Sequence, residues 1–235
     1  MKYNNNLGDK QRYLDFQKRQ LELSRRTAED ARKAKIASNL DKWNILLPEI
    51  LKLAKPNALH PDTLNKLKSV DLKPPHEKNV VINSKDSTTS TFVAYTIIYA
   101  LIKMGIATPS QIKTTNLLDG YNNINGMFES RKWKDDFFSK DARVLLIEGS
   151  SKSLTSMAPR GEEQFWKELQ EFTRAKDKFI IITYATDEKE RSEGLFIPDF
   201  TNDKSINTDI VKNSTFIPLT EVEEEKIKIE QRKAY

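Results

Sequence analysis

The sequence predicts an α/β fold, a parallel five-stranded sheet with flanking helices, preceded by an all-α N-terminal extension. Two observations support this. From Val80 onward, short and nearly continuous apolar runs alternate with segments of helical periodicity, a pattern typical of a parallel sheet covered on both faces. Before that point, residues 9–39 contain no proline or glycine and are rich in Gln, Glu, Arg, Lys, Leu and Ala, which favours one long helix.

The N-terminal third of the chain holds the excess positive charge. Residues 1–79 contain 17 Lys and Arg against 10 Asp and Glu, a net charge of +7, which leaves a net charge of −2 for residues 80–235. Leu14, Leu21 and Ala28 recur every seven residues, but the pattern ends at Lys35, which argues against a long coiled coil. A solvated helix accounts for the charge equally well. If the cations bind phosphates or an acidic partner, the candidates are Arg12, Lys18, Arg19, Arg25, Arg26, Arg32 and Lys33.

We expect three segments in chain order. Residues 1–55 form a basic helical module, whose second helix, Trp43–Ala54, has apolar residues at mostly helical spacing. Residues 56–79 are polar and punctuated by prolines, and are interpreted as a linker. Residues 80–235 form the α/β core.

Strands and helices alternate through this core. The expected strands are the apolar runs at residues 80–82, 112–115, 143–147, 179–183 and 215–219. The expected helices are residues 91–104, which Gly105 ends, two helices between residues 117 and 138, residues 162–175 and residues 221–233. In the last of these, the acidic run from Glu221 to Glu225 is interpreted as a solvated face with ion pairs four residues apart.

The composition excludes several kinds of site. The chain has no cysteine, which excludes disulfides, thiol catalysis and Cys-based metal sites. Its two histidines, His60 and His76, each lie beside a proline and are interpreted as exposed loop residues, so we expect no metal. No run approaches the roughly 18 apolar residues of a membrane span, and the polar start does not resemble a signal peptide. We therefore expect a cytoplasmic protein without a membrane partner.

The connection after the first strand is the expected ligand position, because ligands bind at the carboxyl ends of parallel strands. It reads Ser84-Lys85-Asp86-Ser87-Thr88-Thr89-Ser90-Thr91. A phosphate-binding loop, G-x-x-x-x-G-K-S/T, would lie here. Ser84 and Thr89 take its glycine positions, Ser90 its lysine position and Thr91 its hydroxyl position, so only the hydroxyl is retained.

The order of segments over residues 78–220 resembles the AAA+ ATPases, most of all their helicase-loader and transposition-helper branch, the DnaC/IstB family. The resemblance rests on the strand, loop and helix from Val80 to Met104, on Val144–Glu148 in the place of the Walker B strand, and on Ile180–Ala185 in the place of the strand that carries the sensor residue. The resemblance depends on the spacing and order of these segments and not on identical motifs. It implies an AAA+-like, P-loop type of core without a C-terminal lid, with Glu148 at the metal-binding position of Walker B.

Other positions depart from the family pattern. Gly149 takes the place of the second Walker B acid, Ala185 replaces the sensor Asn, and Arg191 is only a stand-in for the arginine finger. Without the loop lysine, the charge on a γ-phosphate loses its usual partner in the transition state; Lys85 is the alternative cation. We expect a pseudo-ATPase with no catalytic residue, and do not expect ATP with Mg²⁺ as a cofactor. The degenerate nucleotide loop consists of Ser84, Lys85, Ser87, Thr89, Ser90, Thr91 and Glu148.

A further cluster mixes aromatic and basic residues. Lys132 and Trp133, with their neighbours, could neutralise and stack on single-stranded nucleic acid, although core packing explains the aromatics equally well.

The favoured function is that of a DNA-replication accessory protein of the helicase-loader type with an inactive ATPase core. The resemblance implies a replicative helicase or another ATPase subunit as its partner, with single-stranded DNA as a further one. The alternative is a non-catalytic structural or regulatory module that reuses the ATPase fold outside replication, because a fold does not determine a function. An active ATPase with an unorthodox loop is the third hypothesis. The abundance of Asn and Lys fits an AT-rich bacterial or bacteriophage genome.

Overall fold

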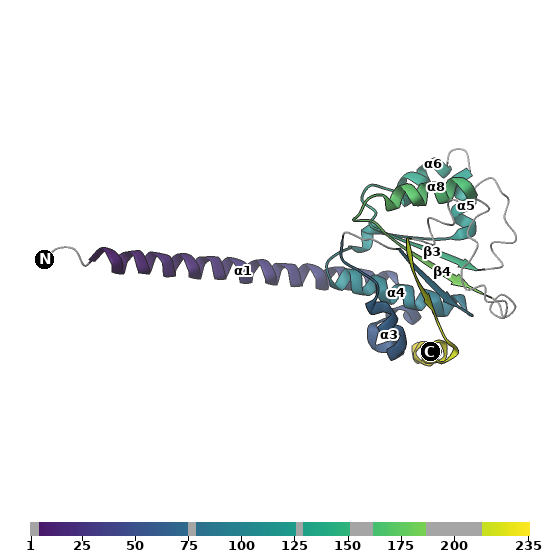
Figure 1. The fold of residues 1–235 in the computed structure, drawn as a ribbon, viewed down its shortest axis with the longest axis horizontal. Coiled ribbons are helices and arrows are strands. Elements are labelled where there is room, and N and C mark those ends of the chain that lie inside the picture. Colours follow the sequence, from purple (N-terminus) through teal and green to yellow (C-terminus); the bar gives the residue numbers. More distant parts are fainter. Residues whose placement is uncertain (1–4, 75–78, 126–128, 151–161, 187–212) are drawn as a thin grey trace.

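Five parallel strands form the sheet of an α/β domain, from which one long helix projects (Figure 1). The computed structural model describes residues 5–74, 79–125, 129–150, 162–186 and 213–235. The strand order is β2-β3-β4-β1-β5. The strands are β1 (Asn79–Ser84), β2 (Ile112–Asn116), β3 (Val144–Ser150), β4 (Phe179–Ala185) and β5 (Ser214–Pro218). The α/β fold, the five-stranded parallel sheet and the N-terminal helix predicted from the sequence are confirmed.

Helices cover both faces of this sheet, so alternate residues of each strand enter two different cores. Ile82 and Ile181 face one core, and Val81 and Ile182 face the other, which also contains Trp166. The first face is covered by α4 (Ser87–Lys103), together with α3 (Pro61–Lys68), α11 (Glu221–Gln231) and the C-terminal end of α1 (Asn5–Leu46). The second is covered by α5 (Leu117–Asn125), α6 (Glu129–Phe137) and α8 (Glu162–Thr173) (Figure 1).

Helix α1 is the long helix that projects from the domain. Its 42 residues correspond to a length of about 63 Å at the usual rise per residue. Residues 12–35 are exposed, whereas Trp43 is buried and stacks on Tyr95 of α4 with 5.7 Å between the ring centroids. The helix was expected to end at residue 39, but it continues because Trp43 packs on the domain, and it ends before Pro48, which disfavours helical backbone in the preceding residue. The expected helix at residues 43–54 is therefore reduced to α2 (Glu49–Lys52).

The described part of the expected linker, residues 56–74, is folded onto the domain. It forms the 3₁₀ turn η1 (Pro56–Ala58) and then α3, and it buries Leu59 and Val70 in the core that α4 covers. Pro61 is the first residue of α3, where a missing N–H is tolerated, and Nδ1 of His60 caps the helix by accepting a hydrogen bond from the N–H of Asp62 at 3.2 Å. His60 and Pro61 therefore form the start of α3, and His60 is a helix cap instead of the exposed loop residue that we expected. His76 lies outside the described residues.

Within the described ranges, no helix is long and apolar enough to cross a membrane.

Candidate functional site

The carboxyl ends of β1, β3 and β4 lie beside the N-terminal part of α4, where the sequence predicts the site. Two of the predicted residues meet here, because Oγ1 of Thr91 donates a hydrogen bond to Oε1 of Glu148 at 3.1 Å. Glu148 is aligned with Thr183 of β4, and the two side chains share the sheet face that α4 covers. These are the hydroxyl and the carboxylate to which the resemblance assigns the last loop position and Walker B.

Glu148 is a partly buried carboxylate. Burial raises its pKa above the usual value, and the hydrogen bond from Thr91 offsets part of this effect. Burial, assisted by the charge of Glu148, raises the pKa of Tyr95 to about 12. The hydroxyl of Thr183, which is 1% exposed, has no hydrogen-bond partner in the described part of the chain. The site thus combines a partly buried carboxylate with a buried hydroxyl.

The connection from β1 to α4 differs from the expected loop. Only Lys85 and Asp86 separate the strand from the helix, because α4 begins at Ser87 instead of Thr91. Asp86 is the N-cap, and its Oδ1 accepts hydrogen bonds from the N–H of Thr88 at 2.9 Å and from the hydroxyl of Thr88 at 3.0 Å. The Asp86 carboxylate thus holds the place that an anion would take at this helix N-terminus.

The serines and threonines expected to wrap a phosphate are internal to this turn. Oγ of Ser84 donates to the carbonyl of Asp86 at 2.6 Å, and Oγ of Ser90 donates to the carbonyl of Ser87 at 3.1 Å. Thr89 is fully buried. The expectation of a polar loop through residue 90 is therefore wrong, since Ser84 ends β1 and residues 87–90 form the first turn of α4.

Helix α11 closes the same turn from the side. Oε1 of Glu224, a residue that is 2% exposed, accepts the N–H of Lys85 at 2.8 Å. The Lys85 ammonium pairs with the carboxylate of Glu221, and Nε2 of Gln231 donates to the carbonyl of Thr88 at 3.3 Å. Lys85, the alternative cation for a γ-phosphate, is thus paired with a carboxylate of α11.

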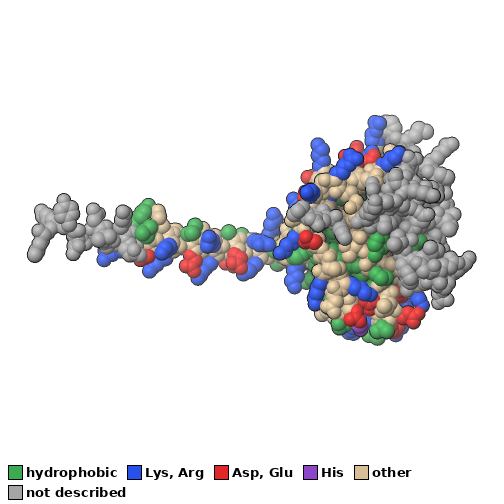
Figure 2. Space-filling view, viewed as in Figure 1, with side chains coloured by type: hydrophobic (Ala, Val, Ile, Leu, Met, Phe, Trp, Pro, Cys, Tyr) green, Lys and Arg blue, Asp and Glu red, His purple; other side chains and the backbone are tan. Residues whose placement is uncertain are grey.

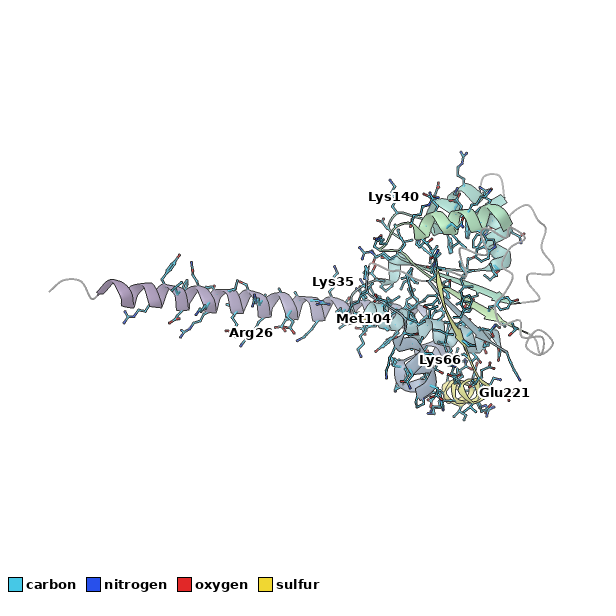
Figure 3. All side chains as sticks on the ribbon, viewed as in Figure 1. Arg26, Lys35, Lys66, Met104, Lys140 and Glu221 are labelled. Carbon is cyan, nitrogen blue, oxygen red and sulfur yellow. The ribbon has the colours of Figure 1, made fainter. Side chains whose placement is uncertain are left out.

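The acidic run of α11 is only in part the solvated face that its sequence predicts, because Glu221 and Glu225 are exposed but Glu223 and Glu224 are buried. Glu223 is 1% exposed and accepts hydrogen bonds from Nζ of Lys66 at 2.7 Å and from the hydroxyl of Thr63 at 3.0 Å. Burial opposes ionisation of Glu223, but the hydrogen bonds from Lys66 and Thr220 outweigh it and lower its pKa. Figure 3 shows Lys66 on α3, close to the helix that carries Glu221. The signal for this contact is the capping box Thr220-x-x-Glu223, which marks a fixed helix start.

Gly149, to which the resemblance assigns the second Walker B position, leaves no room for a larger side chain. A Cβ on Gly149 would lie 2.5 Å from Cδ1 of Leu117, which is fully buried, so an acidic side chain there would require Leu117 to move. Ala185 is buried at the end of β4. Arg191 lies outside the described residues.

The predicted cations of α1 are all exposed and fall into two groups (Figure 2). Some have partners on the chain itself: Arg26 pairs with Glu22 at 2.7 Å, Lys33 pairs with Glu29 at 2.8 Å, and Arg32 donates to the carbonyl of Met104 at 3.2 Å. The others have no ion-pair partner in the part of the chain that is described: Arg12, Lys18, Arg19 and Arg25.

Trp133 is part of the core on the second face of the sheet. Its ring stacks on Phe137 with 4.8 Å between centroids, and the edge of Phe138 lies 6.2 Å away. The adjacent Lys132 is exposed. The ring is half-buried, so core packing accounts for this aromatic residue.

An apolar cavity of about 350 Å³ lies between α3 and α4, and its lining includes Leu64, Leu67, Val70 and Ile97. The interpretation of residues 56–79 as a linker gave no reason to expect it. Among the described side chains, no three His, Cys, Asp or Glu residues cluster in a way that could hold a metal ion.

No protein-family model matches the chain, and no curated protein matches it.

Proposed function

We propose that this protein is a DNA-replication accessory protein of the helicase-loader type, in which α1 is the partner-binding arm and the α/β domain is a scaffold that does not hydrolyse ATP. The observation that carries the proposal is the projection of α1. Residues 12–35 bury nothing in the domain, yet they carry four cations without ion-pair partners in the described chain and large apolar residues that are about half exposed or more. Such a surface suits a binding partner.

The strand order supports an AAA+-like core. The strands are all parallel in the order β5-β1-β4-β3-β2, which is compatible with such a core. The hydrogen bond between Thr91 and Glu148 also supports it, because it joins the N-terminal part of α4 to the C-terminal part of β3, the two places to which the resemblance assigns the loop hydroxyl and Walker B.

The β1–α4 turn supports a core that does not hydrolyse ATP. A γ-phosphate at this turn would meet the carboxylates of Asp86 and Glu224 where an active site has glycine amides and a lysine. Two negative groups at this point disfavour both phosphate binding and the charge that develops in the transition state.

The partner is a replicative helicase or another ATPase subunit, with single-stranded DNA as a further ligand. The test mixes the purified full-length protein with the replicative helicase of its source on a sizing column, and separately titrates it into a labelled single-stranded oligonucleotide at low salt. We expect a complex in at least one assay, weakened by salt and by the triple variant Arg12→Gln, Lys18→Gln and Arg25→Gln.

A matched triple variant of exposed domain lysines, Lys73→Gln, Lys140→Gln and Lys176→Gln, removes the same charge and should leave binding unchanged. Binding of neither helicase nor oligonucleotide would overturn the proposal. Affinity purification that instead returns transcription, virion or transposition components would favour the alternative, an interaction module outside replication. The β1–α4 turn favours that alternative too, since the core has no phosphate cradle that ties it to ATPase chemistry.

A further inference from the structure

One face of α1 packs on the domain at its C-terminal end. Trp43 is buried there, and Cδ1 of Ile36 lies 3.5 Å from where a Cβ of Gly105 would be. Arg32 donates to the carbonyl of Met104, at the C-terminal end of α4 (Figure 3). At this end of α1, apolar side chains pack on the domain, and the neighbouring Arg32 donates a hydrogen bond to a backbone carbonyl.

The same face continues outward without a partner. Going back along the helix in steps of three and four residues from Arg32, through Ala28, leads to Arg25, Leu21, Lys18 and Leu14, which lie on one face of a helix. We call Leu14, Lys18, Leu21 and Arg25 the outer face. Leu14 is 47% exposed and Leu21 is 57% exposed.

Both cations of the outer face lack an ion-pair partner in the described chain, whereas the row beside them is mixed. Arg19 and Arg26 each follow an outer-face cation by one residue, which turns them about 100° around the helix axis. In that neighbouring row Arg26 is neutralised by Glu22, four residues before it, while Arg19 has no ion-pair partner in the described chain. The outer face thus combines two exposed leucines with two cations that are not neutralised.

We propose that the outer face docks in an apolar groove on a partner protein, with carboxylates on the rim of the groove opposite Lys18 and Arg25. The inference rests on the proposed role of α1 as the binding arm. It identifies the ligand of this face as a groove on a protein and not as nucleic acid. A helix that docks in a groove presents anchors at this spacing. The phosphates of a nucleic acid would bind the two cations but leave the two leucines of the outer face without a partner. A second copy of this chain would place two positively charged outer faces against each other.

Adjacent charge reversals test the inference. Lys18→Glu and Arg19→Glu make the same change in charge at neighbouring exposed positions, but only Lys18 belongs to the outer face. To identify the partner, a photo-crosslinking residue is introduced in place of Gln17, which lies beside Leu14 and Leu21. The full-length protein carrying it is expressed and crosslinked in its native cells. After nuclease treatment the crosslinked peptide is mapped by mass spectrometry, and the identified partner is purified.

We expect a mapped peptide that contains Asp or Glu, and binding to the purified partner that falls at least about tenfold with Lys18→Glu but stays unchanged with Arg19→Glu. Reversal of the mapped carboxylate to Lys should restore binding of Lys18→Glu. Leu21→Ala should weaken binding similarly, and Leu23→Ala, on another face, should not. Equal loss with both charge reversals, a nuclease-sensitive association, or crosslinks only to a second copy would overturn the inference.

The outcomes separate this inference from the proposed function. A mapped acidic groove on a protein unrelated to replication would keep the outer face as a docking surface and overturn the loader function. A helicase complex that neither Lys18→Glu nor Leu21→Ala weakens would keep the function and overturn the docking surface.

Discussion

Asp86 and Glu224 place two carboxylates at the carboxyl end of β1, where a parallel sheet commonly binds an anion. Asp86 accepts an N–H of the first turn of α4, and Glu224 accepts the N–H of Lys85. Both carboxylates therefore accept hydrogen bonds from backbone N–H groups that would otherwise be available to a phosphate. The chain satisfies the turn only in part, because the hydroxyl of Thr89 and Nδ2 of Asn83 are buried without a hydrogen-bond partner in the described part of the chain.

Glu148 and Glu223 are both buried or partly buried, but their pKa values are shifted in opposite directions. The raised pKa of Glu148 means that its contribution to stability is fully present below the usual Glu value and is lost as the pH rises through the folded-state pKa. The lowered pKa of Glu223 means that its contribution is present above the usual value and is lost as the pH falls through the folded-state pKa.

This contrast predicts opposite effects of the same substitution. At pH 7, Glu148→Gln should raise the free energy of unfolding, because it removes a charge disfavoured by burial, and Glu223→Gln should lower it, because Lys66 loses its carboxylate partner. Urea unfolding at pH 7 and pH 4 measures both, and each difference from the unmodified chain should shrink at pH 4. A shift in the same direction for both variants would contradict the assignment.

At the scale of elements, α1 is divided between a part that belongs to the domain and a part that does not. Trp43 is 6% exposed and stacks on Tyr95, whereas Phe16 is 59% exposed. The stability of the domain should therefore depend on the C-terminal end of α1 and be indifferent to its outer part.

Two truncations to alanine test this division. Trp43→Ala should lower the free energy of unfolding by about 3–5 kcal/mol, the usual cost of removing a buried aromatic side chain. Phe16→Ala, the matched control, should change it by less than about 0.5 kcal/mol. Chemical unfolding followed by circular dichroism measures both. Similar losses for the two variants would mean that the outer part of α1 also packs on the domain.

The strands of the fold were predictable because buried parallel strands are short apolar runs, such as Val144–Ile147 and Phe179–Thr183. Helix starts were harder to predict, because Ser, Thr, Asp and Pro favour both loops and N-caps. The start of α4 at Ser87 depends on the Asp86 cap, and the start of α3 depends on Pro61. At the site, the resemblance assigned Thr91 and Glu148 to one nucleotide loop, and the structure joins their side chains. The closure of the turn by α11 is a tertiary contact without a local signal.

At the scale of the whole molecule, the protein consists of an arm and a scaffold. The arm lies within the segment with the net charge of +7, and most of the scaffold lies within the segment with the net charge of −2. At the carboxyl end of β1, α11 binds Lys85 of the turn through Glu221 and Glu224, and contacts α4 through the hydrogen bond from Gln231 to the carbonyl of Thr88. Under the proposed function, this closed turn suits a scaffold better than a catalytic site.

The central claim is that the α/β domain does not bind and hydrolyse ATP. Calorimetric titration of the full-length protein with ATP and Mg²⁺, paired with a phosphate-release assay, tests it most directly. We predict no binding in the micromolar range and no turnover, with Glu148→Gln indistinguishable from the unmodified chain in both assays. Micromolar binding accompanied by turnover that Glu148→Gln abolishes would contradict the account, because it would require a nucleotide site at the turn that Asp86 and Glu224 close.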